Sequence, residues 1–262
     1  MSISYKKPSN LIELKEFLDE VVDRVNTKGF IPFDPVSIPH RFKLKQDIEI
    51  AAFFAATFAW GNRKTIIQKC TELLNLMDNA PYEFIVSHTE KDRKKLIGFT
   101  HRTFQSTDTL YFVKTLQNHY QQHESLKSAF LSKSHGYEQK NALINFHRYF
   151  FDDEFAPART KKHVSTPENN SACKRLNLFL KWMVRKDDKG VDFGIWDSIP
   201  MSGLMIPLDI HVSRVSEQLG LHSRKQKDWK TVEEITSNLR KINPTDPVIY
   251  DYALFGLGAG LF

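Results

Sequence analysis

The sequence predicts an all-α protein with two helical lobes and a cleft between them. Apolar residues recur at helical spacing along most of the 262 residues, and no convincing run alternates apolar and polar residues as a strand would. A polar, basic, proline-containing stretch interrupts this pattern after residue 154. The length suits one large domain or two small lobes with a real core.

The first half of the chain contains several strong helix signals. The segment LIELKEFLDEVVDRV places apolar residues from Leu11 to Val25 on one face, and DPVSIPHRF follows as a proline-punctuated loop. After Asp47, IEIAAFFAATFAW is apolar almost all round, which is typical of a helix buried on all sides. GNRKTIIQKCTELLNLM then starts another helix with an inner stripe from Ile66 to Met77.

Further helices are expected at 81–88, 107–122, 124–132 and 138–151. The stretch FAPARTKKHVSTPENNSACKR, with its two prolines, is expected to connect the lobes. We therefore expect a central lobe of residues 40–158 and a second lobe of residues 1–39 plus 159–262.

The C-terminal part is expected to carry the functional residues. A helix is predicted from about Ala172 to Arg185, followed by a long loop at 186–207 and helices at about 210–219, 229–241 and 246–260. Loops of this length inside a compact domain are often functional. The glycines of FGLGAGL favour close helix packing rather than a dinucleotide fingerprint, because no strand precedes them.

Composition restricts the class of protein. Hydrophobic residues make up 41% and charged residues 26%, which is ordinary for a globular protein, and the longest apolar run is about half of a membrane span. The polar start MSISYKKPSN lacks the features of a signal peptide, so a cytoplasmic, nucleoid-associated location is expected. The net charge of +6 favours a polyanionic partner, nucleic acid first.

The chain has two cysteines, Cys70 and Cys173, which are too few to hold an iron–sulfur cluster and too far apart for a zinc site. Both are expected to be buried, inert thiols. We expect neither a metal nor another cofactor.

Lys174 and Asp209 are the main candidates for chemistry, because both are expected at helix starts. Unpaired amides and the helix dipole disfavour a positive charge on Lys174, and partial desolvation would make a neutral, nucleophilic amine accessible. Asp209 occupies an N-cap position, which favours its charged form. The alternative is structural, since lysines are common in surface first turns and aspartate is a frequent N-cap.

These residues lie in segments that resemble a known superfamily. PLDIHVSRVSEQLGL resembles the segment of helix-hairpin-helix DNA glycosylases that carries their catalytic aspartate. The matching positions are Pro207, Asp209, His211, Val212, Arg214, Leu219 and Gly220. CKRLNLFLKWMVR is similar to the helix that begins with the catalytic lysine in the archaeal 8-oxoguanine glycosylase branch.

The whole chain also resembles an uncharacterised bacterial family that is common in Bacteroidetes. The matching segments are FAWGNRK, FTHRTF, KRLNLFLKWMVR, PLDIHVSR and YDYALFGLG. The resemblance implies a base-excision glycosylase with AP-lyase activity on an oxidised purine such as 8-oxoguanine. It assigns Lys174 as the nucleophile and Asp209 as its ionised partner.

One feature departs from the superfamily. The usual hairpin carries Gly-x-Gly, whose amides hold a DNA phosphate, whereas STPENNSA before Lys174 has no glycine. Side-chain and amide donors are expected to replace it, at Ser165, Thr166, Asn169, Asn170 and Ser171.

Other residues are expected to contact DNA. Trp60 or Asn62 is a candidate wedge into the duplex, while Arg63 and Lys64 would meet phosphates. Lys161 and Lys162, in the basic run RTKKH, would also meet phosphates, and His101 and Arg102 are expected to be exposed. The alternatives are a core Trp60 and solvated loops around the basic residues.

Trp196 and Met201 are candidates for stacking on an extruded base, with core packing as the alternative. His211 is assigned to the same base pocket, although a structural role on its helix is the alternative. A metal role is not expected for His211, since no partner stands at metal-ligand spacing.

The sequence leaves three functions open. The first is the glycosylase, acting as a monomer on double-stranded DNA. The second is a non-catalytic DNA- or RNA-binding protein on the same scaffold. The third is an all-α protein-interaction module, which would bind no nucleic acid at physiological salt.

Overall fold

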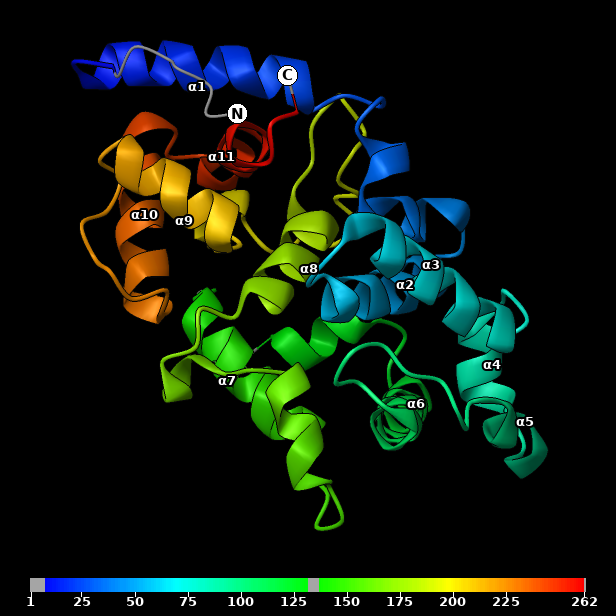
Figure 1. Ribbon diagram of the computed structural model, residues 1–262. Helices are drawn as coiled ribbons and strands as arrows, with labels where there is room; N and C mark the ends of the chain where they lie inside the picture. The colour runs from blue at the N-terminus through cyan, green and yellow to red at the C-terminus, as the bar shows by residue number, and fades with distance from the viewer. Residues whose placement is uncertain (1–7, 132–136, 262) are drawn as a thin grey trace. The chain divides into compact units, whose positions relative to one another are not determined.

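The computed structural model describes residues 8–131 and 137–261, and within them it contains helices, loops and two isolated bridges but no strand (Figure 1). This confirms the all-α prediction. The chain divides into two compact units, each described here by itself. Unit 1 comprises Met1–Ile31, Tyr137–Gln139 and Thr166–Phe262, and unit 2 comprises Pro32–Gly136 and Lys140–Ser165.

Unit 2 is built around one buried helix. Its α-helices are α2 (Lys45–Phe58), α3 (Arg63–Leu76), α4 (Pro81–Ser87), α5 (Glu90–Lys95), α6 (Ser106–Tyr120) and most of α7 (Gln139–Phe150). Every residue of α2 from Ile48 to Phe58 is buried, as its all-round apolar pattern predicts. An aromatic cluster surrounds α2, in which the Phe53 ring stacks on Phe112 with centroids 5.5 Å apart.

The one acidic residue buried in α2, Glu49, is structural. Its carboxylate accepts hydrogen bonds from the Tyr120 hydroxyl at 2.9 Å, from the Leu126 amide at 2.9 Å and from the Ser125 hydroxyl. Burying a carboxylate is tolerable when such donors replace its water shell. Glu49 therefore attaches the segment after α6 to α2.

Unit 1 consists mainly of five α-helices. They are α1 (Leu11–Val25), α8 (Lys174–Val184), α9 (Ile210–Gln218), α10 (Trp229–Ile242) and α11 (Tyr250–Ala259). Helix α11 lies against both α1 and α9 (Figure 1). The face of α1 from Leu14 to Val25 is buried as predicted, but Leu11 is 49% exposed and belongs outside it.

Three local expectations differ from the structure. Residues 124–132 form the 3₁₀ helix Leu126–Phe130 rather than an α-helix, and 246–260 divides into the 3₁₀ helix Pro247–Ile249 and α11. Helix α5 was not predicted, because EKDRKK has no apolar periodicity. A capping box between Thr89 and Asp92 stabilises its start instead.

Both cysteines are buried, as expected from the sequence, and burial raises the pKa of the Cys70 thiol far above its usual value. No helix among the described residues has the length and apolar character needed to cross a membrane.

Candidate active site

Lys174 is the first residue of α8, at the end of a tight turn. Asn170 and Cys173 both have left-handed backbones, with φ of 54° and 49°. Such a conformation costs a non-glycine residue on the order of 1 kcal/mol, so other contacts must hold it. The Cys173 amide donates to Ser171 Oγ at 3.2 Å, and the Asn170 side chain donates to Asp228 Oδ2 at 3.0 Å. The turn before Lys174 therefore contains two non-glycine residues with positive φ.

Asp209 is the N-cap of α9, as the sequence predicted. Its Oδ1 accepts hydrogen bonds from the amides of His211 at 2.8 Å and Val212 at 3.0 Å. Its backbone is extended, and its side chain is half-buried. These amides and the helix dipole stabilise the carboxylate, because they place partial positive charge beside it.

The start of α9 is anchored on α11. His211 Nδ1 donates to the Gly258 carbonyl at 2.8 Å, and Arg214 donates to the same oxygen at 2.6 Å. A Cβ on Gly258 would lie 2.7 Å from the Cβ of His211 and 3.0 Å from its backbone, so only glycine permits this approach. His211 therefore has the structural role that the sequence left as an alternative, and it fixes the position of Asp209.

Asp251, in the first turn of α11, connects the two predicted residues. It is 8% exposed, and its carboxylate pairs with Lys181 Nζ at 3.3 Å. Burial, the largest cause, raises the pKa of Asp251 to about 6, while the Lys181 charge opposes the rise. The charge of Asp209 raises this pKa further, and that of Lys174 lowers it. Lys174 and Asp209 therefore both lie within electrostatic reach of one buried carboxylate.

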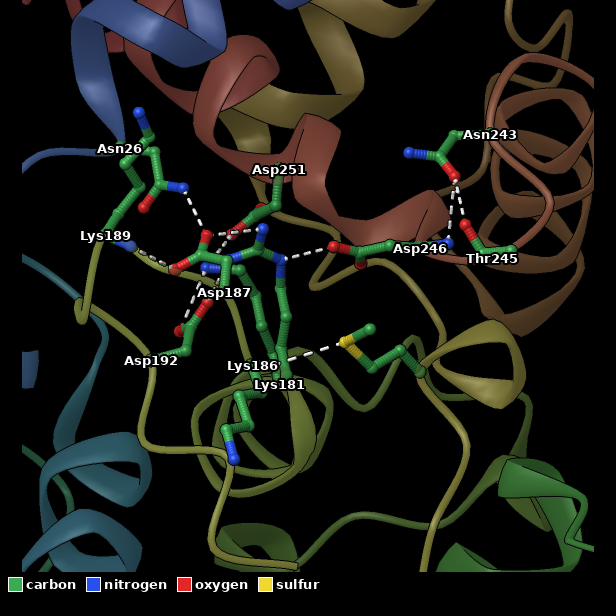
Figure 2. A network of polar contacts seen from close by, with 12 residues as sticks. Asn26, Lys181, Lys186, Asp187, Lys189, Asp192, Asn243, Thr245, Asp246 and Asp251 are labelled. Atoms are coloured by element: carbon green, nitrogen blue, oxygen red, sulfur yellow. Dashed lines mark hydrogen bonds and ion pairs between the residues drawn. The ribbon is translucent and has the colours of Figure 1, made fainter. Parts of the chain in front are cut away.

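Lys181 and Asp251 belong to a larger buried network in unit 1 (Figure 2). Lys181 is 2% exposed, and its Nζ lies 3.5 Å from Asp192 and 3.6 Å from the centre of the Tyr252 ring. Arg185, which is fully buried, bonds Asp192 through Nη1 and Asp246 through Nε, each at 2.9 Å. Its Nη2 also lies 2.8 Å from Asp187.

This network contains more acidic than basic groups. Two cations, Lys181 and Arg185, face four carboxylates. Burial, the largest cause, also raises the pKa of Asp246, and the nearby Asp192 adds to the rise while Arg185 opposes it. Because the carboxylates outnumber the cations, the surroundings of Asp251 favour positive charge.

Lys181, Asp192 and Asp251 were not predicted as site residues from the sequence. Two of these residues could have been found from the sequence, because each is a charged residue at a position where the helical pattern predicts burial. A charge at such a position needs a buried partner. Lys181 stands in the apolar run LFLKWMV and Asp251 in YDYALF. Lys181 also follows Lys174 by seven residues, which places both on the same face of α8.

Two of the candidate DNA-contacting residues of unit 2, Trp60 and Arg102, lie together. The Arg102 guanidinium lies 4.7 Å from the centre of the half-buried Trp60 ring, next to Gly61 with φ of +107°. Asn62 caps α3 by accepting from the Thr65 amide at 3.3 Å, so Arg63 and Lys64 begin that helix. The motifs FAWGNRK and FTHRTF therefore meet in space.

The expected exposure of His101 was wrong. This side chain is 2% exposed, and its Nε2 bonds the Phe58 carbonyl at 3.2 Å. Burial, the largest cause, lowers the pKa of His101 despite that bond, and the nearby Arg102 and Lys69 lower it further. His101 packs edge-on against Trp60, with ring centroids 6.2 Å apart, whereas Arg102 is exposed.

The basic run RTKKH is divided between two roles. Lys161 and Lys162 are exposed on the 3₁₀ helix Ala158–His163, as a phosphate-binding role requires. Arg159 and His163 instead face the buried Asp108 at 3.3 and 3.5 Å. Ser165 is the last residue of unit 2, while Asn170 and Ser171 lie in the turn of unit 1 before Lys174.

The two candidate base-stacking residues lie in different environments. Trp196 is fully buried and packs edge-on against Phe179, which favours the core-packing alternative. Met201 is half-buried in a 3₁₀ turn, and its sulfur accepts from the Lys186 amide at 3.3 Å. The base-stacking role of Met201 stays a prediction.

No group of three or more histidine, cysteine, aspartate or glutamate side chains within the described ranges is arranged to hold a metal ion.

Residues 34–260 match the profile of the DUF2400 family, described as a protein of unknown function. No curated protein and no solved structure matched the chain.

Proposed function

We propose that this chain, which belongs to the DUF2400 family, is a DNA glycosylase with AP-lyase activity that removes an oxidised purine such as 8-oxoguanine. The observation that carries the proposal is the buried Asp251, which contacts α8 through Lys181 and whose carboxylate is influenced by the charges of both Lys174 and Asp209. Segments distant in sequence place an amine and a capped carboxylate in one electrostatic environment. The type of reaction is inferred from the resemblance of the Lys174 and Asp209 segments to those of DNA glycosylases.

The proposed reaction begins when Lys174 acts as a neutral amine. The lone pair of its Nζ forms a bond with the sugar C1′, while the glycosidic bond breaks and its electron pair leaves with the base. The departing base takes a proton from solvent. Loss of a proton from Nζ and opening of the C1′–O4′ bond, with O4′ protonated, then produce a Schiff base that permits β-elimination.

Asp209 contributes electrostatic stabilisation in this mechanism. The sugar becomes cationic as the base leaves, and a fixed carboxylate lowers the energy of that charge. Because the amides of α9 hold Oδ1 in place, the carboxylate does not have to reorganise during the reaction. Removing the charge while keeping the cap should therefore slow the reaction without unfolding the helix.

The turn before α8 supports a helix-hairpin-helix arrangement. In this proposal, the positive φ of Asn170 and Cys173 lets a glycine-free segment make the turns that glycines make in a phosphate-binding hairpin. A glycosylase must also extrude its target nucleotide from the duplex. Trp60 and Arg102 are proposed to contact the DNA during that step, as a wedge and a phosphate ligand.

Borohydride trapping is the direct test, because it reduces a Schiff base to a stable protein–DNA adduct. The protein should be mixed with duplexes that contain an abasic site or one of a panel of oxidised purines. We expect a covalent adduct with the wild-type protein and none with Lys174→Gln. Both proteins should bind the duplex equally.

Lys230→Gln is a matched control, since Lys230 is an exposed lysine in the first turn of α10. It should trap as efficiently as the wild-type protein. Absence of an adduct on every duplex, with circular dichroism showing an intact fold, would rule out the lyase. Equal trapping by wild type and Lys174→Gln would rule out Lys174 as the nucleophile.

A second candidate function is non-catalytic nucleic-acid binding. It is favoured by the exposed Arg102 over Trp60 and by the exposed Lys161 and Lys162. It predicts salt-sensitive binding of DNA or structured RNA, with no dependence on Lys174 or Asp209. Charge reversal at Lys161 and Lys162 would then abolish the whole function rather than only weaken substrate binding.

A further inference from the structure

Asp251 stands where three elements of unit 1 meet. On α11 it shares one face with Phe255 and Gly258, at spacings of four and seven residues. His211 of α9 packs on that same face, with its ring 6.0 Å from Phe255 and Nδ1 bonded to Gly258. From α8, Lys181 reaches Asp251 at 3.3 Å.

The structural role of Asp251 does not account for its position. Lys181 already has the carboxylate of Asp192 at 3.5 Å and the face of Tyr252 at 3.6 Å. A further buried carboxylate in a network with excess negative charge is costly, because it must be desolvated while it shares its cation, Lys181, with Asp192. A second role, in which the charge of Asp251 acts on a group other than Lys181, would explain its position.

A second cation whose charge acts on Asp251 is Lys174. Lys174 and Lys181 lie on one face of α8, two turns and about 10 Å apart along the axis. The charged groups acting on Asp251 are Lys181 and Lys174 from α8 and Asp209 from the start of α9. From α1, Asp19 bonds the hydroxyl of the neighbouring Tyr250 rather than Asp251.

We propose that Asp251 is a positioning residue of this site, whose buried carboxylate stabilises the positive charge that forms on the Lys174 nitrogen during the reaction. This inference rests on the proposed function. The charge appears when Nζ bonds to C1′, is lost with the Nζ proton, and forms again in the protonated Schiff base. A preorganised anion in a poorly solvated site lowers the energy of both species. Asp209 acts on the sugar, whereas Asp251 acts on the nitrogen.

The pH dependence of trapping is the first test. Because Asp251 gains a proton near pH 6, single-turnover trapping by the wild-type protein should fall on the acid side with a midpoint near that value. Asp251→Asn should trap about 10-fold more slowly at pH 7.5. It should also lose the midpoint near pH 6. Asp251→Glu should restore part of the rate and the pH dependence.

Asp246→Asn is the matched control. Asp246 is a carboxylate of the same network with a raised pKa, but it bonds Arg185 rather than Lys181. It should change thermal stability while leaving the midpoint near pH 6 in place. An unchanged profile in Asp251→Asn, with wild-type trapping intact, would overturn the inference.

A second measurement needs no DNA. Reductive ¹³C-methylation labels the lysine amines, and the Lys174→Gln variant identifies the Lys174 signal in the NMR spectrum. In the wild-type protein this signal should show an inflection near pH 6 that reports Asp251, and Asp251→Asn should remove it. Absence of the inflection overturns the inference even if trapping succeeds.

The two measurements separate the possible failures. If the wild-type protein traps no duplex but the inflection is present, the glycosylase proposal fails while the coupling of Asp251 to Lys174 stands. If trapping succeeds without any dependence on Asp251, the glycosylase stands and the role of Asp251 fails.

Discussion

Asp209 and Asp228 are both N-caps in unit 1, and they differ in what their second oxygen does. Their backbones are nearly identical, with φ of −120° at Asp209 and −122° at Asp228. Oδ1 of each accepts helix amides. Oδ2 of Asp228 is occupied by Arg224 at 2.7 Å and Asn170 at 3.0 Å. Within the described residues, the hydrogen bonds of the Asp209 carboxylate are confined to Oδ1.

The difference separates a structural cap from a cap that can also act on a ligand. Burial tends to raise the pKa of Asp228, but bonds from Thr231, Arg224 and Asn170 outweigh it and lower the pKa to about 2. This carboxylate joins the turn before α8 to α10. The charge of Asp209 acts instead on the buried Asp251, and the hydrogen bonds of its Oδ1 leave Oδ2 for chemistry. Four substitutions test this distinction, from the largest expected effect to the smallest.

The largest effect is expected at Lys174. Lys174→Gln should abolish borohydride trapping, because an amide nitrogen cannot form a Schiff base. Its thermal stability should stay close to that of the wild-type protein, since Lys174 is half-buried at a helix end. Gel electrophoresis of the adduct and circular dichroism measure the two quantities. Residual trapping by Lys174→Gln would show that another lysine is the nucleophile. The contrast between Asp209 and Asp228 would then not bear on the reaction.

The second effect is expected at Asp209. Asp209→Asn should reduce the single-turnover rate about 100-fold, because a preorganised charge at the site is lost. It should change the free energy of unfolding by less than about 1 kcal/mol, since asparagine caps helices as well as aspartate does. Rapid-quench kinetics and urea denaturation provide the measurements. A large loss of stability with an unchanged rate would make Asp209 a purely structural cap.

Asp228 should show the opposite pattern. Asp228→Ala should lower the free energy of unfolding by about 2 kcal/mol, because a cap and its bonds to Arg224 and Asn170 disappear. The trapping rate should remain within about twofold of wild type where the protein is folded. The lowered pKa means that this stabilisation is present above about pH 4 and is lost as the pH falls towards 2. Urea denaturation at pH 7 and pH 3 tests both statements.

The smallest effect is the pH dependence of stability caused by Asp251. Its pKa in the folded protein, about 6, lies above the ordinary value of 3.8, so the folded state binds this proton more tightly than the unfolded state. The contribution of Asp251 is therefore most favourable below pH 4 and is lost as the pH rises through 6.

Asp251→Asn cannot ionise, so it should gain stability relative to wild type between pH 5 and pH 8, on the order of 1–2 kcal/mol. Chemical denaturation across that range measures the gain. A higher free energy of unfolding of Asp251→Asn at pH 8, together with slower trapping, would show that Asp251 serves function while it lowers stability. Equal pH dependence in both proteins would contradict the raised pKa.

Much of the fold could be predicted, because helices depend on neighbours within a few residues. The apolar stripe of α1 and the all-round burial of α2 follow from spacing alone. The N-cap role of Asp209 also follows from its place before an amphipathic run. Where the prediction failed, as at α5, the helix depends on side-chain capping rather than on apolar periodicity.

The candidate site was predicted only in part. Lys174 and Asp209 lie in recognisable segments, but Lys181 and Asp251 were missed because each is a single charge in an apolar run. Trp60 and Arg102 were singled out separately, and the structure brings the two together. Trp196 was named as a base-stacking candidate, yet its ring is fully buried.

The sequence by itself determined the all-α class, most helix positions and the N-cap role of Asp209, since hydrogen bonds along a helix and its side-chain caps involve residues a few positions apart. Only the tertiary structure decided which cap is bonded to neighbouring elements and which carboxylate pairs with Lys181 of α8. The partners of Asp228 and Asp251 come from other elements of unit 1, so their environments exist only once those elements pack. The same packing supplies the desolvation that raises the pKa of Asp251, and no local pattern of residues contains that information.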